Sequence, residues 1–376
     1  MINIPRLTNE FASLVAIDSP AFGEKAMGAY LKHALSELGL SVFEDDAGTD
    51  HPGSCGNILG FLEGDERLGA PLLLCAHMDT VEPAHGKLAV VGEDGRITSG
   101  GDTVLGADDA SGIVVILEAL RTLRERGLPH RPLEVLFTIA EEVYCYGAAR
   151  FDISRLRAKE AYVLDLIGPI GSAAYSAPSI LFFTAVVQGQ SAHAGFEPEK
   201  GVHAIAAAAS AISALKLGHV DSDTTVNVGT ISGGLALNIV PDFCEVRGEV
   251  RSFSHDKAEA QMEAVRQQFT LSAQAVGATV EFEVSEGCRA YQTPLESAVV
   301  RRFERTCKSL SLPVQLDKTF GGSDHNCLAA KGISGLVIAS GMHNCHTCQE
   351  YTTIDELTQA AELVLALILS EDGETA

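Results

Sequence analysis

Histidines and carboxylic acids follow several short apolar segments of this sequence, at the points where those segments end. The side chains in question are His77, Asp79, Glu141, Glu142, Asp165, His343 and His346. Asp108 and Asp109 stand in a glycine-containing turn that precedes an apolar segment with helical spacing. Imidazole nitrogens and carboxylate oxygens together make the mixed ligand set that Zn²⁺ uses, and several carboxylates brought to one place need a cation. If these side chains converge, the sequence predicts a metal site.

Each of these residues also has an ordinary structural explanation. Asp109 could be an acid in the first turn of a helix, where the helix dipole favours negative charge. A single histidine after a strand is often a surface residue, and the pair Glu141 and Glu142 could lie on a solvated face. The occurrence of all these residues at strand ends is what favours a functional site.

The apolar segments themselves predict strands of a parallel sheet that is buried on both faces. Pro71–Ala76, Leu133–Ala140 and Ala161–Leu164 are such segments, and Gly112–Leu123, between the first two, has the apolar spacing of a helix. This order is a β-α-β unit, in which the two strands run parallel. Because ligand sites in such sheets form beyond the carboxyl ends of the strands, the residues named above are expected at one edge.

The last part of the chain continues the same pattern. Ser334–Ala339 predicts another buried strand ahead of the two late histidines, and Thr353–Leu369 predicts an amphipathic closing helix. We therefore expect residues 292–376 to complete a domain begun by residues 1–176. The expected fold class is α/β, with a mostly parallel sheet.

Residues 177–291 have a different rhythm. The expected elements are a strand at Ile180–Val187, a helix at His203–Leu217, strands at Thr224–Ile231 and Cys244–Phe253, a helix at Asp256–Val276 and a strand at Thr279–Val284. This β-α-β-β-α-β order is that of a ferredoxin-like α+β domain. The segment is therefore predicted to be a second domain inserted into the first.

Composition and charge exclude several functions. The chain has 376 residues, enough for two domains, and its formal net charge of −23 is unfavourable for binding nucleic acid or an anionic membrane surface. The amino-terminal segment is unlike a secretion signal, and no apolar segment reaches the ~20 residues of a membrane span. Nine cysteines, an odd number, favour reduced thiols and a cytoplasmic location. Cys345 and Cys348 form a lone CxxC pair, for which a structural zinc site is the alternative interpretation.

The strand-end residues resemble the five signature stretches of the co-catalytic two-zinc exopeptidases and amidohydrolases. That family includes peptidase T, carboxypeptidase G, acetylornithine deacetylase and succinyl-diaminopimelate desuccinylase. The resembling stretches are His77–Asp79, Gly106–Asp109, Glu141–Glu142, Asp165 and His346, and in the insertion SAHAG (Ser191–Gly195), GGLALN (Gly233–Asn238) and VRS (Val250–Ser252). Within the family, GADDASG, GGSDHN (Gly321–Asn326) and HTCQEY (His346–Tyr351) are most similar to the peptidase T-like branch. The resemblance implies a zinc-exopeptidase-like catalytic domain and an inserted lid and dimerisation domain.

The resemblance also implies a ligand set for two Zn²⁺ ions per chain. Asp108 would bridge the two ions. His77 and Asp165 would complete the first site, and Glu142 and His346 the second. Co²⁺ and Mn²⁺ are alternatives for such a mixed ligand set.

Two further carboxylates receive roles from the same resemblance. Glu141 would be the general base, which takes a proton from the attacking water and returns it to the leaving amine. Asp79 would accept the second N–H of the His77 imidazole and so fix its orientation. His343 is the reserve candidate for the place of His346 as a ligand.

In the insertion, three residues resemble family groups that contact the substrate. His193 resembles the histidine that reaches the partner subunit's site in dimers, so a homodimer is expected. Asn238 and Arg251 resemble groups that hold the substrate, and the planar fork of an arginine suits a terminal carboxylate. A turn residue is the alternative for His193, and a surface charge is the alternative for Arg251. Gly321–Ser323 resembles a loop that closes over the site, with a plain turn as the alternative.

One segment departs from the family pattern. Val143–Tyr146 separates the paired glutamates from Gly147, whereas family members commonly have a glycine directly after the pair. These bulky residues leave the size of the substrate open. Asp109 and His325 lie beside matched positions and are not expected to bind metal.

The resemblance implies metal-dependent hydrolysis of a peptide bond in short peptides. An aspartate at the position of Asp165 is typical of aminopeptidase-type members, so a peptidase T-like aminopeptidase or tripeptidase is expected. An N-acyl amino acid amidohydrolase, or a dipeptidase or carboxypeptidase with the same mechanism, is the alternative. A catalytically idle homologue that binds metal or peptides is less favoured, because Glu141 and all the matched ligands are present.

Overall fold

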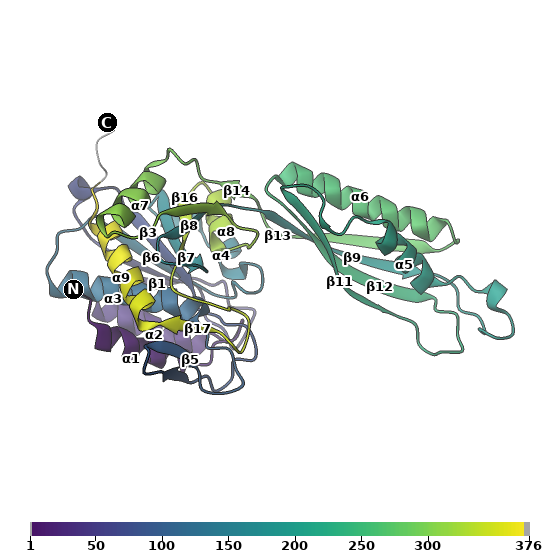
Figure 1. The fold of residues 1–376 in the computed structure, drawn as a ribbon, viewed down its shortest axis with the longest axis horizontal. Coiled ribbons are helices and arrows are strands. Elements are labelled where there is room, and N and C mark those ends of the chain that lie inside the picture. The colour runs from purple at the N-terminus through teal and green to yellow at the C-terminus, as the bar shows by residue number, and fades with distance from the viewer. Residues whose placement is uncertain (1, 372–376) are drawn as a thin grey trace. The chain divides into compact units, whose positions relative to one another are not determined.

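The computed structural model describes residues 2–371, which fall into two compact units. One unit consists of Met1–Ser176, Gln292–Thr319 and Ser323–Ala376, and the other of Ala177–Tyr291 and Phe320–Gly322. We call them the catalytic unit and the inserted unit. The predicted fold class, an α/β domain interrupted by an α+β domain, is confirmed (Figure 1). Residue 1 and residues 372–376 of the predicted first domain lie outside the described residues.

The catalytic unit is built on one large sheet. Its strands follow the order β1-β2-β6-β3-β7-β16-β8-β14, and β15 pairs with β8. The four central strands β6, β3, β7 and β16 are parallel, β2 is antiparallel to both β1 and β6, and β8 is antiparallel to β16 but parallel to β15. The strands are β1 (Ser41–Glu44), β2 (Ile58–Leu62), β3 (Leu72–His77), β6 (Leu133–Thr138), β7 (Glu160–Leu166), β8 (Ser172–Ala177), β14 (Tyr291–Gln292), β15 (Gln315–Lys318) and β16 (Ser334–Ala339). A small second sheet contains β4 (Ala89–Val91), β5 (Arg96–Ser99) and β17 (Tyr351–Thr353).

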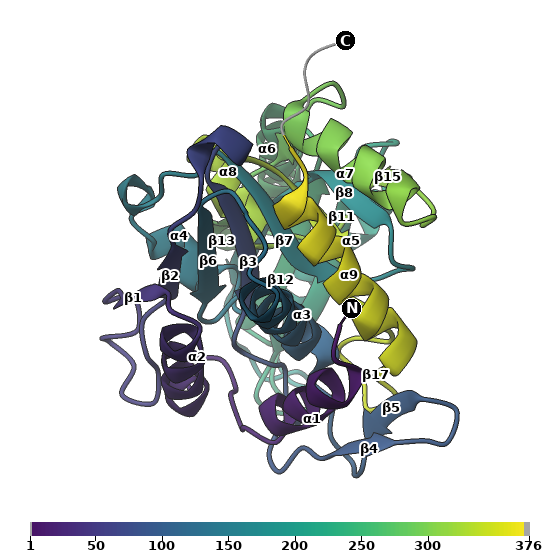
Figure 2. The same ribbon diagram turned by 90° about the vertical axis from the view of Figure 1, so that its left-hand side faces the viewer.

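Helices cover this sheet. They are α1 (Ile4–Val15), α2 (Lys25–Glu37), α3 (Ala107–Glu125), α4 (Tyr146–Arg150), α7 (Ala298–Ser309), α8 (Asp324–Ala330) and α9 (Ile354–Leu369). Helix α3 packs on β3 and β7 and against α1 and α9, so that segments from both ends of the chain lie side by side (Figure 2). The closing helix is confirmed within one residue of its predicted start, because Thr353 is its N-cap and accepts a hydrogen bond from the Glu356 amide.

The inserted unit is one antiparallel sheet covered by two helices. Its elements are β9 (Ser179–Gln188), α5 (Ala204–Ala214), β10 (Gly218–His219), β11 (Thr224–Gly233), β12 (Phe243–Ser252), α6 (His255–Gln274) and β13 (Thr279–Cys288). The strand order β10-β11-β12-β9-β13 matches the predicted ferredoxin-like arrangement. Both helices pack on the sheet around buried side chains such as Phe183, Val246 and Phe269.

Two predicted boundaries in the inserted unit were wrong. The helix expected to reach Leu217 ends at Ala214, because Leu215 has extended backbone angles and Gly218 enters a strand at φ 77°. The last strand runs on past Val284 to Cys288, because it stays paired with β9 along that length. No helix among residues 2–371 is long and apolar enough to cross a membrane.

Candidate metal centre

Parallel strands bring the first two candidate ligands together. His77 is the last residue of β3, and Asp165 lies near the end of β7, its parallel neighbour. The His77 Nε2 atom is 3.9 Å from an Asp165 carboxylate oxygen. His77 is buried, because it ends a strand covered on both faces, and Asp165 is partly exposed at the sheet edge.

Asp108 stands between two imidazoles. Its Oδ1 atom is 3.0 Å from His77 Nε2, and its Oδ2 atom is 3.3 Å from His346 Nε2. The first turn of α3 presents this side chain, and Asp108 and Asp109 depart there from helical backbone angles. The two carboxylate oxygens therefore face two different imidazoles, as a carboxylate that bridges two ions would require.

The second imidazole comes from the loop between β16 and β17. His346 Nε2 lies 3.0 Å from Glu142 Oε1, and the His346 backbone is left-handed, with φ 63°. His343, the reserve candidate, instead lies 2.8 Å from Glu356 Oε1 and stacks on Tyr351. Of the two histidines, the structure thus brings His346 into the cluster.

The arrangement contains two overlapping sets of three side chains whose ligand atoms lie within 4.8 Å of one another. One set is His77, Asp108 and Glu142, and the other is His77, Glu141 and Asp165. Burial and the neighbouring carboxylates raise the pKa values of Glu141 and Asp165 well above their ordinary range. Negative charge is therefore costly here. Imidazole and carboxylate groups that face the same space, with an excess of negative charge, are suitable ligands for a divalent metal ion.

The imidazoles already interact with these carboxylates. Hydrogen bonds to Asp108 and Glu142 raise the pKa of His346 to about 10. Burial opposes the charged form of His77, but hydrogen bonds to Asp108 and Asp79 raise its pKa well above the usual range. The electrostatics of the cluster therefore favour a positive charge at these two nitrogens.

Asp79 orients the neighbouring groups mainly through the backbone. The His77 Nδ1–H donates to the carbonyl oxygen of Asp79 at 2.9 Å, whereas the Asp79 carboxylate lies 3.4 Å away. That buried carboxylate accepts the backbone N–H groups of Glu141 at 2.9 Å and of Glu142 at 3.1 Å. Asp79 thus bonds the imidazole through its carbonyl oxygen, and its carboxylate positions the segment that carries both glutamates.

A residue that the sequence reasoning missed supports Asp108. Glu350 is buried, and its carboxylate accepts the backbone N–H groups of Gly106 at 2.6 Å and of Asp108 at 2.9 Å. Burial raises the pKa of Glu350 to about 7. The only signal in the sequence was its place in HTCQEY, four residues after His346.

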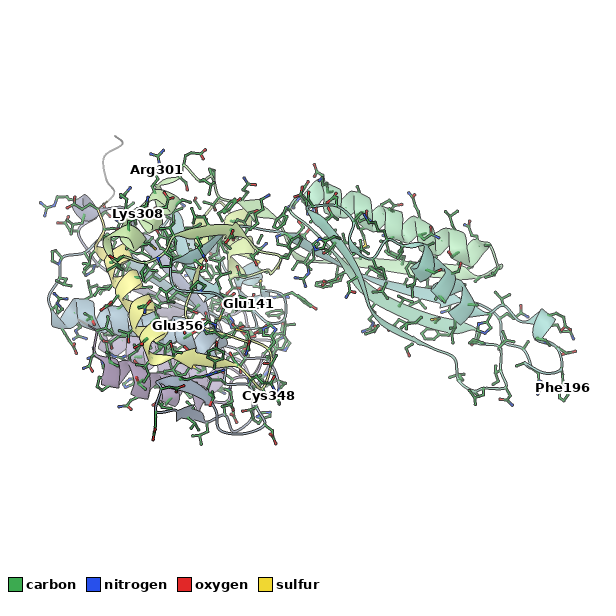
Figure 3. All side chains as sticks on the ribbon, viewed as in Figure 1. Glu141, Phe196, Arg301, Lys308, Cys348 and Glu356 are labelled. Atoms are coloured by element: carbon green, nitrogen blue, oxygen red, sulfur yellow. The ribbon has the colours of Figure 1, made fainter. Side chains whose placement is uncertain are left out.

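Two candidate residues of the inserted unit, His193 and Asn238, lie in neighbouring loop segments, because the Ala194 backbone N–H donates to the Asn238 carbonyl oxygen at 3.0 Å. His193 is exposed, and its Nδ1 accepts the backbone N–H groups of Gly195 and Phe196 at 3.1 Å. Its ring stacks on that of Phe196, which is 82% exposed (Figure 3). Asn238 is exposed as well. Within this unit these side chains form no site of their own.

Arg251 of β12 is already paired. Its guanidinium bonds both carboxylate oxygens of Glu249, at 2.8 and 3.0 Å, and donates to the carbonyl of Phe320 at 2.7 Å. Phe320–Gly322 belongs to the inserted unit, and Ser323 caps α8 in the catalytic unit. The predicted Gly321–Ser323 loop therefore spans the boundary between the units in sequence.

Asp109 and Cys348 make other contacts. Asp109 accepts the backbone N–H groups of His77 and Gly112, which leaves it a structural role. Cys348 is exposed and donates to the carbonyl of Asp102 at 3.7 Å. Among residues 2–371, neither cysteine of the CxxC pair belongs to a set of three side chains that could hold an ion.

Comparison with known proteins identifies the family of this chain. The family profile described as the peptidase dimerisation domain, of the M20 group, matches residues 175–274. Over its full length, the chain is 36% identical to protein YqjE of Bacillus subtilis, covering 98% of this chain and 99% of that one. The chain belongs to the M20 family of metallopeptidases.

Two solved structures are similar to nearly the whole of this chain. Aminopeptidase PepT of Bacillus cereus is 37% identical, with a TM-score of 0.90, and a tripeptidase of Staphylococcus aureus is 34% identical, with a TM-score of 0.94. Each comparison covers 98% of both chains. These similarities span both units and all the candidate residues.

Proposed function

We propose that this protein is a peptidase T-like aminopeptidase that cleaves short peptides, tripeptides among them, at the bond after a free amino-terminal residue. The full-length similarity to an aminopeptidase and a tripeptidase carries this proposal. The Asp165 side chain agrees with it, because an aspartate at this position is typical of aminopeptidase-type relatives. The substrate is then a short peptide, and a homodimer and a cytoplasmic location go with the same proposal.

We assign the metal ligands from the contacts described above. His77 and Asp165 would hold one ion, Glu142 and His346 the other, and Asp108 would contribute one oxygen to each. When bound, two Zn²⁺ ions supply positive charge that polarises the scissile carbonyl and stabilises the negative charge that develops on its oxygens. Co²⁺ or Mn²⁺ would fit the same donors.

Glu141 would act as the general base. Glu141 lies beside the cluster, and burial of its carboxyl group and the charge of Asp165 raise its pKa. A raised pKa suits a group that must take a proton from the attacking water and then give it to the leaving amine nitrogen. Asp79 holds the Glu141 amide, so the base is anchored from behind.

The inserted unit would supply the groups that hold the substrate. Arg251 would bond the terminal carboxylate of the peptide after exchanging its present partner Glu249. Asn238 would bond a peptide carbonyl, and His193 would act in the site of the partner subunit.

The test combines metal analysis with a peptide panel. We expect two ions per chain under saturating Zn²⁺, and hydrolysis of free dipeptides and tripeptides but not of the same peptides with a blocked amino group. Equal hydrolysis of blocked and free peptides would instead favour the N-acyl amino acid amidohydrolase. Fewer than two ions together with no amide hydrolysis would leave the proposal without support.

A variant separates the base from the ligands. Glu141→Gln should keep both ions and lower kcat by roughly 10²–10⁴-fold, because the amide cannot accept the proton. Glu93→Gln, an exposed residue of the same unit, is the matched control and should behave as the parent protein does. An unchanged rate for Glu141→Gln would remove Glu141 as the base.

A further inference from the structure

Glu141 also belongs to a third set of ligand-capable side chains. The set is Glu141, Cys145 and Asp324, whose ligand atoms lie within 4.8 Å of one another. The Cys145 thiol donates to Glu141 Oε1 at 3.4 Å. All three residues belong to the catalytic unit, and neither Cys145 nor Asp324 is needed for the two ions assigned above.

Cys145 reaches this place through a tight turn. Its backbone N–H donates to the Glu141 carbonyl at 2.7 Å, and both Tyr144 and Cys145 have left-handed backbone angles, with φ 61° and 55°. The turn folds Cys145 back onto Glu141 and buries it completely. This turn lies in Val143–Tyr146, the segment between the paired glutamates and Gly147.

Asp324 supplies the independent evidence for a ligand. It is 1% exposed, and its Oδ2 atom accepts a hydrogen bond from the Thr138 hydroxyl. Within residues 2–371, its Oδ1 atom is buried and has no hydrogen-bond partner. A buried carboxylate oxygen without a partner is costly, and natural structures usually provide a donor or an ion.

Charge in this space points to a cation. Burial raises the pKa of Asp324 to about 6, although the Thr138 hydrogen bond opposes the shift, so a negative charge on this carboxylate is unfavourable. Two carboxylates and a thiol that face one another offer only negative or neutral groups. A bound divalent cation would satisfy the free oxygen and offset the repulsion.

We propose that Glu141, Cys145 and Asp324 form an additional site for a thiophilic divalent cation such as Zn²⁺. Tetrahedral coordination at ordinary Zn–O and Zn–S lengths places ligand atoms ~3.3–3.8 Å apart, which the Cys145–Glu141 contact already meets. Asp324 needs to approach by about 1.5 Å or less to complete three ligands, and water would occupy the fourth position. The thiol loses its proton to solvent as the ion binds.

Occupation of this site would switch off the enzyme. A Glu141 carboxylate bound to the additional ion can no longer accept a proton from water, so excess Zn²⁺ inhibits. This consequence rests on the proposed function of Glu141, whereas the binding of the ion does not.

The experiment counts ions first and measures activity second. The two-metal protein is titrated with further Zn²⁺, and bound metal is measured after removal of free ion. We expect a third equivalent to bind and peptide hydrolysis to fall in parallel. The same titration with Co²⁺ should produce a thiolate-to-metal charge-transfer band, whereas Mn²⁺, which prefers oxygen ligands, should add no third equivalent.

Variants assign the site. Cys145→Ala and Asp324→Asn each remove one ligand and should bind two ions but not the third, so that excess Zn²⁺ no longer lowers their own starting rates. The two substitutions differ in chemistry, so a folding defect in one leaves the other as a test, and circular dichroism checks both. Cys348→Ala removes an exposed thiol of the same unit and should keep the third ion.

The outcomes distinguish the two proposals. A stoichiometry that stays at two in excess Zn²⁺, or a third ion that survives both Cys145→Ala and Asp324→Asn, would overturn the additional site. A third ion that binds as described in a protein without peptidase activity would support the site and count against the proposed function alone.

Discussion

The two units present their candidate residues in opposite ways. In the catalytic unit, residues separated by up to 269 positions, from His77 to His346, meet around one carboxylate. In the inserted unit, His193 bonds its own loop and Arg251 bonds its strand neighbour Glu249. The first set forms a site on its own, whereas the second set makes contacts only with its own surroundings.

The difference follows from sheet topology. Parallel strands place their carboxyl ends at one edge, so side chains after β3 and β7 converge without long loops. An antiparallel sheet sends consecutive strand ends to opposite edges, so its loops do not converge in the same way. The inserted unit therefore gathers no comparable cluster of the candidate side chains.

The sharpest test of the catalytic cluster is its shared carboxylate. Asp108→Asn removes the charge between the two imidazoles and should lower kcat/KM by at least roughly 10³-fold, with loss of bound metal. Metal content and peptide hydrolysis are measured together. Asp94→Asn, an exposed residue of the same unit, is the control. Full metal content and activity in Asp108→Asn would show that the cluster does not act as one site.

Substitution of Glu350, which accepts the Asp108 backbone N–H, should have a smaller effect. Glu350→Gln keeps one acceptor oxygen and loses the other, so only one of the backbone N–H groups of Gly106 and Asp108 keeps its present bond. We expect metal affinity to fall by roughly 10–100-fold, as measured by competition with a chelator. Glu362→Gln, which is exposed on α9, is the matched control. Unchanged affinity would limit Glu350 to a packing role.

The inserted unit can be tested on its arginines. Arg251→Lys keeps the charge but loses the planar fork, so KM for short peptides should rise by roughly 10-fold, with a smaller change in kcat. Arg247, on the same strand, pairs with Glu245 at 2.8 Å and is more exposed, so Arg247→Lys is the matched control. Equal effects of the two variants would mean that Arg251 has no special contact with substrate.

The last prediction concerns stability, not activity, and a buried histidine of the catalytic unit. Burial lowers the pKa of His325 to about 4, below the ~6.5 of an unfolded histidine. Between these values the unfolded chain binds more protons, so lowering the pH from 7 to 5 should remove about 2 kcal/mol of stability through this residue. Denaturant unfolding at several pH values should show a weaker pH dependence in His325→Gln. An identical slope in the parent and the variant would contradict this account.

The sheet and the main candidate residues could be predicted from the sequence, because buried strands and the polar residues that follow them form a local pattern. Sequence reasoning missed Glu350, because the groups that this carboxylate bonds lie 242 and 244 positions away. It could not place Cys145 beside Asp324 either, since that contact depends on two left-handed residues in a turn. Helix ends such as Ala214 depend on the start of the next strand, which the Ala-rich pattern does not reveal.

Strand β16 lies in the sheet between β7 and β8, although it is made almost at the end of the chain. During synthesis, the inserted unit has all its strands once Cys288 has emerged, while the catalytic sheet still has a gap beside β7. Domains fold largely as units during synthesis, so the sheet of the catalytic unit can be completed only after β16 has been made. A central strand of the catalytic sheet and the candidate ligand His346 are therefore both made after every strand of the inserted unit.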